Sequence, residues 1–364
     1  MKFSKSQELI DYINELENIY ELNLSISDIL SAVMGNRNIT KKDEINALVN
    51  SSNYSEKEIL LSKISEYLDI DLSFEDNQYI FDEHIAKSIT CLDNKQYKDN
   101  PYYQAIKIQN IKDGDLELAC DQYQAYEVFP YLDMSCSSNY VEINSLGFFK
   151  EDFPFIALNY KGVTWMSITP NEIETMKSAI SKVSGNVLVF GLGLGYFAFM
   201  AANKEEVHKV TVIEKDHKII NLFNKYLLPQ FPNAKKITVI RDDALNYLNK
   251  NLAYDYAFID LWHDPIDGIE LYLKFKSLER KQNKCQFLYW LESSFTLYLR
   301  RCFISLLLES RDNLPENNYA KSKTVDDNII NKYYFATKNL VINNKVDVDN
   351  LLSDKSLINL LLDH

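Results

Sequence analysis

The stretch that decides the fold is VLVFGLGLGYFAFMAANKEEVHKVTVIEKD, residues 187–216. An apolar run opens it and ends in a turn with three alternate glycines, Gly191, Gly193 and Gly195. A helix-like segment follows, and a second apolar run ends in Glu214. This order of strand, glycine-rich turn, helix and strand is typical of a nucleotide-binding unit in a parallel α/β sheet.

The alternation of strands and helices continues beyond this unit. Five apolar, β-branched strands are predicted at NVLVFG (186–191), KVTVIE (209–214), KITVIR (236–241), YDYAFIDL (254–261) and CQFLYWL (285–291). Helices are predicted between them, for example at Lys218–Leu227 and Ala244–Leu252, and again from Glu292 onward. Strands of this composition belong to a parallel sheet that is buried on both faces.

Two further regions precede this sheet. Residues 1–100 are predicted to form a helical N-terminal domain, because apolar side chains such as Leu9, Ile13 and Leu16 recur at helical spacing. We expect this domain to be a substrate cap or a dimerisation module without chemistry of its own, so a homodimer stays open. Tyrosines in the segment that follows, such as Tyr123, fit either a substrate pocket or simple packing.

Residues 101–168 are predicted to form a small antiparallel β region. Its strands are YVEINSL (140–146), FPFIALNY (153–160) and VTWMSIT (163–169), and Asn159–Gly162 supplies a turn. The third domain, residues 169–364, holds the parallel sheet and a helical C-terminal extension. It opens with Thr169, Pro170 and Glu172, which predict a capping box at the start of a helix that runs to about Ser181.

Composition limits the partners of the chain. The net charge of −13 disfavours nucleic acid and anionic membranes, which bind basic surfaces. The five cysteines include no CxxC pair, so we expect no metal site and no disulfide framework. The N-terminal residues lack the apolar core of a signal peptide, and the uncharged stretch at residues 187–203 is short for a membrane span. We therefore expect a cytoplasmic protein that acts on a small molecule.

The ends of the strands indicate which nucleotide is bound. A carboxylate at Glu214 suits the ribose hydroxyls, which is common to dinucleotide and S-adenosylmethionine (SAM) enzymes. The dinucleotide motif GxGxxG needs a third glycine where this chain has Tyr196, which disfavours an NAD-dependent oxidoreductase. After the third strand, an acidic residue of the Asp242-Asp243 pair suits the adenine amino group, and Ala244 leaves room for the ring.

Taken in order, GLGLG, VIEKD, RDDAL and FIDLWHD resemble the class I SAM-dependent methyltransferase superfamily over about residues 169–290. The resemblance implies a Rossmann-like fold in which Gly191, Gly193 and Gly195 border the methionine moiety of SAM. By the same resemblance, Glu214 binds the ribose and Asp243, followed by Ala244, binds the adenine. The end of the fourth strand, Asp260, would face the transferred group.

One branch of the superfamily, the spermidine synthase-like aminopropyltransferases, resembles the chain more closely. Its DxxDPxGP motif corresponds to DLWHDPIDG, residues 260–268. The resemblance implies that Asp260 orients or deprotonates an amine and that Asp264 holds a second ammonium group. The chain departs from the branch by one extra residue between these aspartates, by a glycine turn without an aspartate, and by the lack of a proline after Gly268.

Each candidate also has a purely structural interpretation. Gly195 fits close helix packing, Asp242 fits a helix N-cap, and Glu214 fits a solvated strand end. His263 is a candidate base, since imidazole ordinarily titrates near neutrality, but it equally fits a solvent-facing loop. Trp262 fits either a cation-binding face or a packed wall.

The function predicted from the sequence is in-line methyl transfer from SAM to a small-molecule acceptor, with Asp260, His263 and Asp264 as the candidate catalytic residues. One alternative is an aminopropyl or aminocarboxypropyl transferase that acts on a polyamine or an amino acid and uses decarboxylated SAM or SAM. The other alternative is a non-catalytic binding protein that retains the fold.

Overall fold

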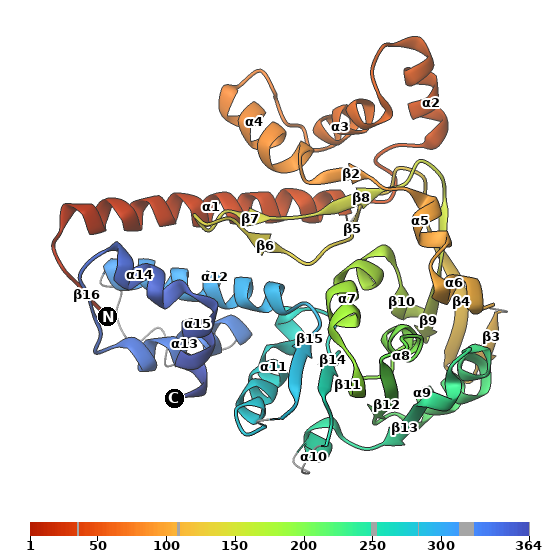
Figure 1. Cartoon of the computed structure of the whole chain (residues 1–364). Coiled ribbons are helices and arrows are strands. Elements are labelled where there is room, and N and C mark those ends of the chain that lie inside the picture. The colour runs from red at the N-terminus through yellow and green to blue at the C-terminus, as the bar shows by residue number, and fades with distance from the viewer. Residues whose placement is uncertain (35, 108–109, 249–252, 283, 313–323, 364) are drawn as a thin grey trace.

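The computed structural model describes residues 1–34, 36–107, 110–248, 253–282, 284–312 and 324–363. Its central sheet has five parallel strands in the order β13-β12-β11-β14-β15 (Figure 1). The strands are β11 (Gly185–Phe190), β12 (Val207–Glu214), β13 (Ile237–Arg241), β14 (Tyr256–Ile259) and β15 (Gln286–Tyr289). Strand addition reverses direction after β13, so β11 and β14 lie side by side at the topological switch point, where such sheets bind ligands.

The predicted Rossmann-like fold is confirmed by this topology. The helices that follow the strands are α8 (Tyr196–Ala202), α9 (His217–Leu222), α10 (Ala244–Leu248), α11 (Pro265–Glu279) and α12 (Glu292–Arg311). The predicted helix at 218–227 is confirmed, although its second half, Phe223–Leu227, is π-helical. Residues 249–252 of the predicted helix at 244–252 lie outside the described residues.

A four-stranded antiparallel sheet with the order β10-β9-β4-β3 precedes the parallel sheet. Its strands are β3 (Ile111–Asp113), β4 (Leu116–Tyr123), β9 (Phe153–Tyr160) and β10 (Val163–Ile168). Lys161 and Gly162 join β9 to β10 with positive φ at both residues, which is the twist that a two-residue hairpin prefers. The predicted turn and its two strands are confirmed, whereas β3 and β4 were not predicted.

The predicted strand at 140–146 is wrong as a single element. It is divided into β7 (Glu142–Ile143) and the start of β8 (Leu146–Phe148), which belong to different sheets. The backbone N–H of Leu146 bonds to the carbonyl of Ser88, which draws β8 into another ladder. The short strands that pair there are β2 (Ile89–Cys91) and β5 (Phe129–Pro130) with β8, and β6 (Ser135–Cys136) with β7.

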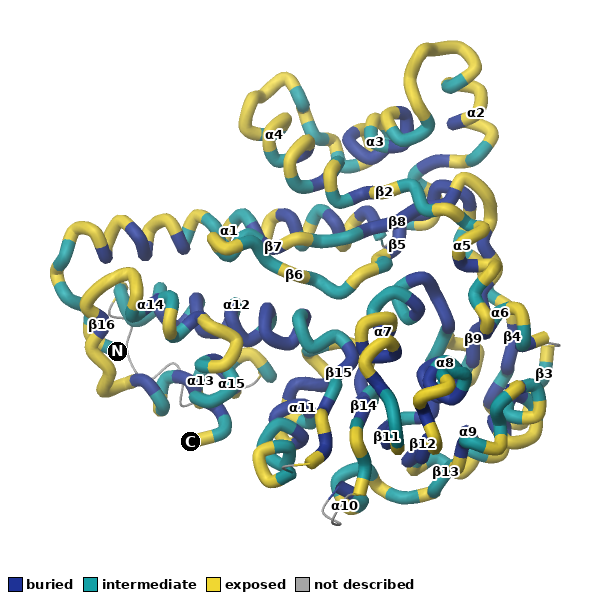
Figure 2. The backbone as a smooth tube through the Cα atoms, in the orientation of Figure 1, coloured by how far each residue is buried: buried dark blue, intermediate teal, exposed yellow. Residues whose placement is uncertain are grey.

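The region before residue 100 is mainly helical, as predicted, apart from the short strands β1 (Lys2–Phe3) and β2. Its helices are α1 (Gln7–Met34), α2 (Lys42–Ser51), α3 (Glu56–Tyr67), α4 (Glu75–Ile80), a π-helical segment (Phe81–Ala86) and α5 (Asn94–Lys98), followed by α6 (Pro101–Ala105). The first half of α1 packs into the main core, while its second half packs with α2, α3 and β8 in a second core. Figure 2 shows that the outer surfaces of α2 and α4 are largely exposed.

The C-terminal helices pack against α12, which also contacts α1. They are α13 (Val325–Thr337), α14 (Lys345–Leu352) and α15 (Asp354–Leu362), and β16 (Val341–Ile342) pairs with β1 (Lys2–Phe3). The two ends of the chain therefore lie near one another, on the side of the C-terminal helices (Figure 1). Within the described ranges, no helix combines the length and the apolar character that crossing a bilayer requires.

Helix α7 (Pro170–Lys182) links the antiparallel sheet to the parallel sheet, and it corrects one prediction. It begins after Thr169 with proline in its first turn, as expected, but Thr169 makes no side-chain cap bond, so the predicted capping box is wrong. The hydroxyl of Thr169 instead hydrogen-bonds with Tyr123 of β4. Glu172 is consequently released from a capping role, and its side chain lines a cavity.

Candidate functional site

A cavity of about 720 Å³ lies at the carboxyl ends of the parallel strands. Its lining includes the residues that follow β11, β12, β13 and β14, namely Gly191–Ala198, Glu214–Asp216, Asp242–Leu245 and Asp260–His263. The sequence predicts that Gly193, Glu214 and Asp243 converge, and the structure brings all three to this cavity. Its volume is within the range of small-molecule and cofactor sites.

The three glycines of the turn have different surroundings. A Cβ atom on Gly191 would lie 1.9 Å from the carbonyl oxygen of Asp260, so only glycine lets β11 and β14 approach there. A Cβ on Gly195 would lie 2.4 Å from the ring of Phe223, which is the close helix packing considered above. On Gly193 it would meet only the sulfur of Met166 at 3.9 Å, so Gly193 is the glycine that faces open cavity space.

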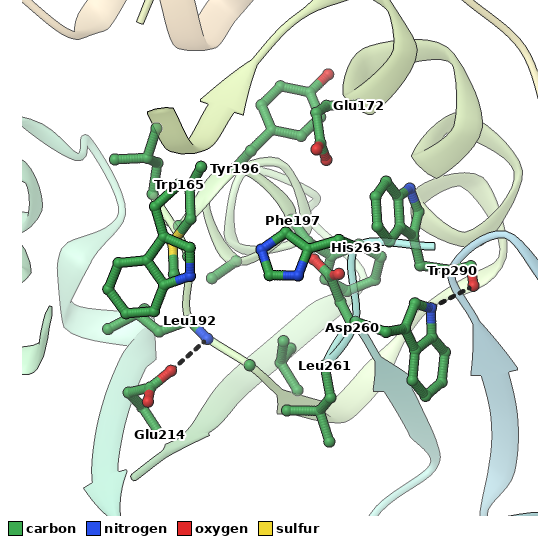
Figure 3. Close-up of a pocket in the computed structure, with 18 of the residues that line it drawn as sticks. Trp165, Glu172, Leu192, Tyr196, Phe197, Glu214, Asp260, Leu261, His263 and Trp290 are labelled. Atoms are coloured by element: carbon green, nitrogen blue, oxygen red, sulfur yellow. Dashed lines mark hydrogen bonds between the residues drawn. The ribbon is translucent and has the colours of Figure 1, made fainter. Parts of the chain in front are cut away.

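Glu214 is held against the glycine turn by backbone hydrogen bonds. One carboxylate oxygen accepts from the N–H of Leu192 at 3.2 Å, as Figure 3 shows, and the other accepts from the N–H of Asp216 at 2.7 Å. These bonds fix the carboxylate at the end of β12 and leave lone pairs directed to the cavity. Glu214 is therefore an oriented acceptor rather than a freely solvated strand end.

The segment after β13 also lines the cavity, with Asp242, Asp243 and Ala244 adjacent. The carboxylate of Asp243 accepts the N–H of Asn246 at 3.0 Å, so Asp243, rather than Asp242, caps α10. The carboxylate of Asp242 accepts the N–H of Asp243 at 2.8 Å. Both carboxylates are thus oriented by the backbone at the edge where the resemblance places adenine.

Asp260 lies at the end of β14, beside the glycine turn. Its backbone N–H bonds to the carbonyl of Phe190 at 2.9 Å, which fixes it at the switch point. Burial raises the pKa of Asp260 to about 7, while nearby His263 acts in the opposite direction. Glu172 of α7 faces the same space, and burial together with the charge of Asp260 raises the pKa of Glu172 well above its usual range.

The structure separates the other two candidate catalytic residues. His263 lines the cavity, but its ring is largely exposed and its Nδ1 lies 3.0 Å from a carboxylate oxygen of Asp267. Asp264 does not line the cavity: its carboxylate accepts the N–H groups of Ile266 and Asp267 and caps α11. The cavity that the described residues form therefore offers no binding position at Asp264 for a second ammonium group.

Aromatic side chains close the site on two sides (Figure 3). Trp165 of β10 faces the glycine turn, at a β-bulge between Thr164 and Met166, the kind of irregularity that redirects side chains beside active sites. On the other side, the indole of Trp290 is fixed by a 2.8 Å bond to Thr175, and Trp262 donates to the carbonyl of Trp290 at 3.1 Å. Trp262 is 5% exposed, which favours the packed-wall interpretation.

Side chains from residues 100–123 also contact the site. The hydroxyl of Tyr102 donates to the carbonyl of Leu194 at 2.6 Å and thereby fixes the glycine turn. Asn100 donates to the hydroxyl of Tyr196 at 3.0 Å, at the position where a dinucleotide fold has its third glycine. Tyr123 lines the cavity itself.

The charge of the cavity tests whether SAM fits. Six carboxyl groups line it, against a single lysine, Lys215, among the described residues. A cationic sulfonium is therefore favoured over a phosphate-bearing dinucleotide, whose anionic groups would meet these carboxylates. The open face at Gly193 and the oriented acceptor at Glu214 also suit an adenosyl group, so the residues present fit SAM.

Two spermidine synthases and one methyltransferase are among the solved structures that match the chain. A spermidine synthase in complex with the transition-state analogue AdoDATO matches with 18% identity and a TM-score of 0.31, over 42% of this chain and 60% of its own. Spermidine synthase from Thermotoga maritima matches with 15% identity and a TM-score of 0.29, over 49% and 70%. A protein from Klebsiella pneumoniae named as an O-methyltransferase matches with 18% identity and a TM-score of 0.24, over 30% and 49%.

The chain spans less than two thirds of the length of the first of these structures. No protein-family model and no curated protein sequence matches the chain.

Proposed function

We propose that the chain is a SAM-dependent methyltransferase that acts on a small molecule in this cavity. The observation that carries the proposal is the convergence of four strand ends on one cavity, with an open glycine face, the oriented carboxylate of Glu214 and the half-buried Asp260. Bound SAM would supply a methyl group on a sulfonium, whose carbon–sulfur bond breaks with its electron pair going to sulfur as the acceptor binds the methyl carbon.

The residues of the chain position the reactants and receive one proton. An N–H or O–H acceptor loses a proton when it forms the new bond, and Asp260 takes that proton. A general base is most effective when its pKa lies near the working pH, and burial raises the pKa of Asp260 to about 7. Aromatic walls from Trp165 and Trp290 exclude water around it.

Aminopropyl transfer is the second candidate, because one observation favours it. Decarboxylated SAM carries two positive charges and no carboxylate, which suits a cavity with six carboxyl groups and one lysine among its described lining residues. The position of Asp264 at the start of α11 argues against it, since the branch that the chain resembles would need this carboxylate in the cavity.

Identification of the nucleoside product decides between these reactions. The chain is incubated with SAM or decarboxylated SAM and a metabolite extract as the source of acceptors. S-adenosylhomocysteine from SAM supports methyl transfer. Methylthioadenosine indicates aminopropyl transfer if it arises from decarboxylated SAM, and aminocarboxypropyl transfer if it arises from SAM. Binding without product indicates a non-catalytic protein, and no binding of either donor contradicts the proposal.

Two matched variants locate the chemistry within the same loop. Asp260→Asn should lower the rate of product formation about 100- to 10,000-fold and leave donor affinity nearly unchanged. Asp264→Asn should leave the rate of methyl transfer unchanged, because that side chain caps α11 outside the cavity. An equal loss in both variants would favour the aminopropyl reaction.

A further inference from the structure

Glu172 occupies a position that its sequence context does not explain. It lies in the first turn of α7, directly after the antiparallel strand β10, and lines the cavity opposite the strand ends. Figure 3 shows its carboxyl group directed into the same space as that of Asp260. Two acidic side chains, one from helix α7 and one from the end of β14, therefore line the end of the cavity where the transferred group would lie.

Neither carboxyl has a compensating partner within the described part of the chain. No hydrogen bond or ion pair joins Glu172 or Asp260 to a described side chain, unlike Glu214 or Asp243, which accept backbone N–H groups. The titratable groups that face the pair are His263, from the loop after β14, and the tyrosines of β4 and α8, Tyr123 and Tyr196.

This arrangement leads the carboxyl groups of Asp260 and Glu172 to lose their protons in different pH ranges. Burial raises the pKa of Asp260 to about 7, and His263 opposes the rise. Burial also raises the pKa of Glu172 well above its usual range, and the negative charge of Asp260 adds to that rise. Two desolvated carboxyl groups that interact in this way do not ionise together, so the pair retains a proton when Asp260 is a carboxylate.

We propose that Glu172 and Asp260 form an acid–base pair, in which protonated Glu172 donates a hydrogen bond into the cavity and ionised Asp260 accepts the proton of the acceptor. The role of Asp260 rests on the proposed function, whereas the location of the proton is a property of the chain alone. Groups whose surroundings separate their pKa values commonly divide acid and base roles in this way.

The pair also defines the chemical class of the acceptor. The acceptor must present an N–H or O–H proton to Asp260 and a lone pair to the hydroxyl of protonated Glu172. A hydroxyl group meets both requirements at one oxygen, because it has two lone pairs. An amine uses its single lone pair to attack the methyl carbon, so an amine acceptor needs a second hydrogen-bond acceptor for Glu172. A carboxylate acceptor has no proton to give and would face the ionised carboxyl of Asp260, so it is excluded.

Infrared difference spectroscopy during a pH titration tests the pair without any ligand, because protonated and ionised carboxyl groups absorb at different frequencies. In the wild-type chain, one carboxyl should ionise near pH 7 and a second protonated carboxyl should persist above that pH. Glu172→Gln should abolish the persistent band, and Asp260→Asn should abolish the step near pH 7. Glu270→Gln, an exposed position on α11 outside the cavity, should change neither.

A wild-type spectrum without protonated carboxyl above pH 7 would overturn the pair, as would a persistent band that survives Glu172→Gln. Circular dichroism establishes whether each variant folds. If Glu172→Gln fails to fold, Asp260→Asn alone still tests whether the titration step near pH 7 belongs to Asp260. Calorimetric titration with SAM separates the two proposals. Carboxyl titration as described, without SAM binding, removes the proposed function only, and SAM binding without the titration steps removes the pair only.

Discussion

The two walls of the cavity are built in different ways. The wall at the strand ends presents backbone turns and carboxylates that the backbone orients, such as Glu214 and Asp243. The wall from β10 and α7 presents side chains, chiefly Trp165, Met166 and Glu172. Under the proposed function, the first wall would recognise the donor through main-chain geometry that tolerates little change. The second wall would be free to vary with the acceptor.

The largest effect is expected at Gly191, in the first wall. Gly191→Ala places a Cβ atom 1.9 Å from a backbone oxygen of β14, at a residue whose φ is +96°. Backbone atoms cannot yield as flexible side chains do, so we expect the free energy of unfolding to fall by about 3 kcal/mol. Urea unfolding followed by circular dichroism measures the loss.

Gly193→Ala is the matched control in the same turn. Its Cβ would meet only a sulfur atom at 3.9 Å, so the left-handed φ of +50° is its sole penalty, about 1 kcal/mol. Equal losses of unfolding free energy in Gly191→Ala and Gly193→Ala would show that the close approach of β11 and β14 does not cause the destabilisation.

The second effect concerns donor affinity. Glu214→Ala removes the oriented acceptor at the end of β12, and loss of hydrogen bonds to a charged group should weaken SAM binding about 10- to 100-fold. Isothermal titration calorimetry measures the change. Glu206→Ala, just before the start of β12, should leave the affinity unchanged, and unaltered binding in Glu214→Ala would remove the ribose assignment.

The pH dependence of stability tests whether the carboxyl of Asp260 is withdrawn from solvent between the two walls. The folded chain keeps a proton on Asp260 up to about pH 7, whereas the unfolded chain loses it near the ordinary aspartate pKa of 3.8. The folded state therefore binds more protons across that interval, and the contribution of Asp260 to stability falls as pH rises from 4 to 7. Denaturant unfolding at several pH values should show a shallower decline in Asp260→Asn, and an unchanged slope would place this carboxyl in solvent.

The smallest effect is expected in the second wall. Trp165→Ala removes an aromatic face beside the glycine turn and should weaken SAM binding about three- to tenfold, while Trp165→Phe should retain most of the affinity. Quenching of tryptophan fluorescence by SAM in the wild-type chain gives an independent measure. A loss as large as that of Glu214→Ala would contradict the division of roles between the walls.

The first wall was predictable because its geometry follows from regular structure. Parallel strands end at one edge of a sheet, so residues that follow β11, β12, β13 and β14 meet there however far apart they lie in sequence. The glycines and Glu214 could therefore be placed from spacing alone. The choice between Asp242 and Asp243 as the cap of α10 could not, because it depends on one local hydrogen bond.

The second wall depends on contacts that leave no periodic signal. Glu172 matched a capping box, but Thr169 makes no side-chain cap bond and contacts Tyr123 of another strand instead. Trp165 looked like any residue of an alternating strand, and the bulge that redirects it was not visible. The one available signal was that two acidic residues, Glu172 and Asp260, follow strands of adjacent sheets.

A crystal structure of the chain soaked with SAM tests the central claim most directly. The account predicts an adenosyl group in the cavity, with its ribose hydroxyls on Glu214, its methionine portion along Gly193, and its sulfonium toward Asp260 and Glu172. Density for SAM elsewhere on the molecule, or a cavity that stays empty at saturating SAM, would contradict it.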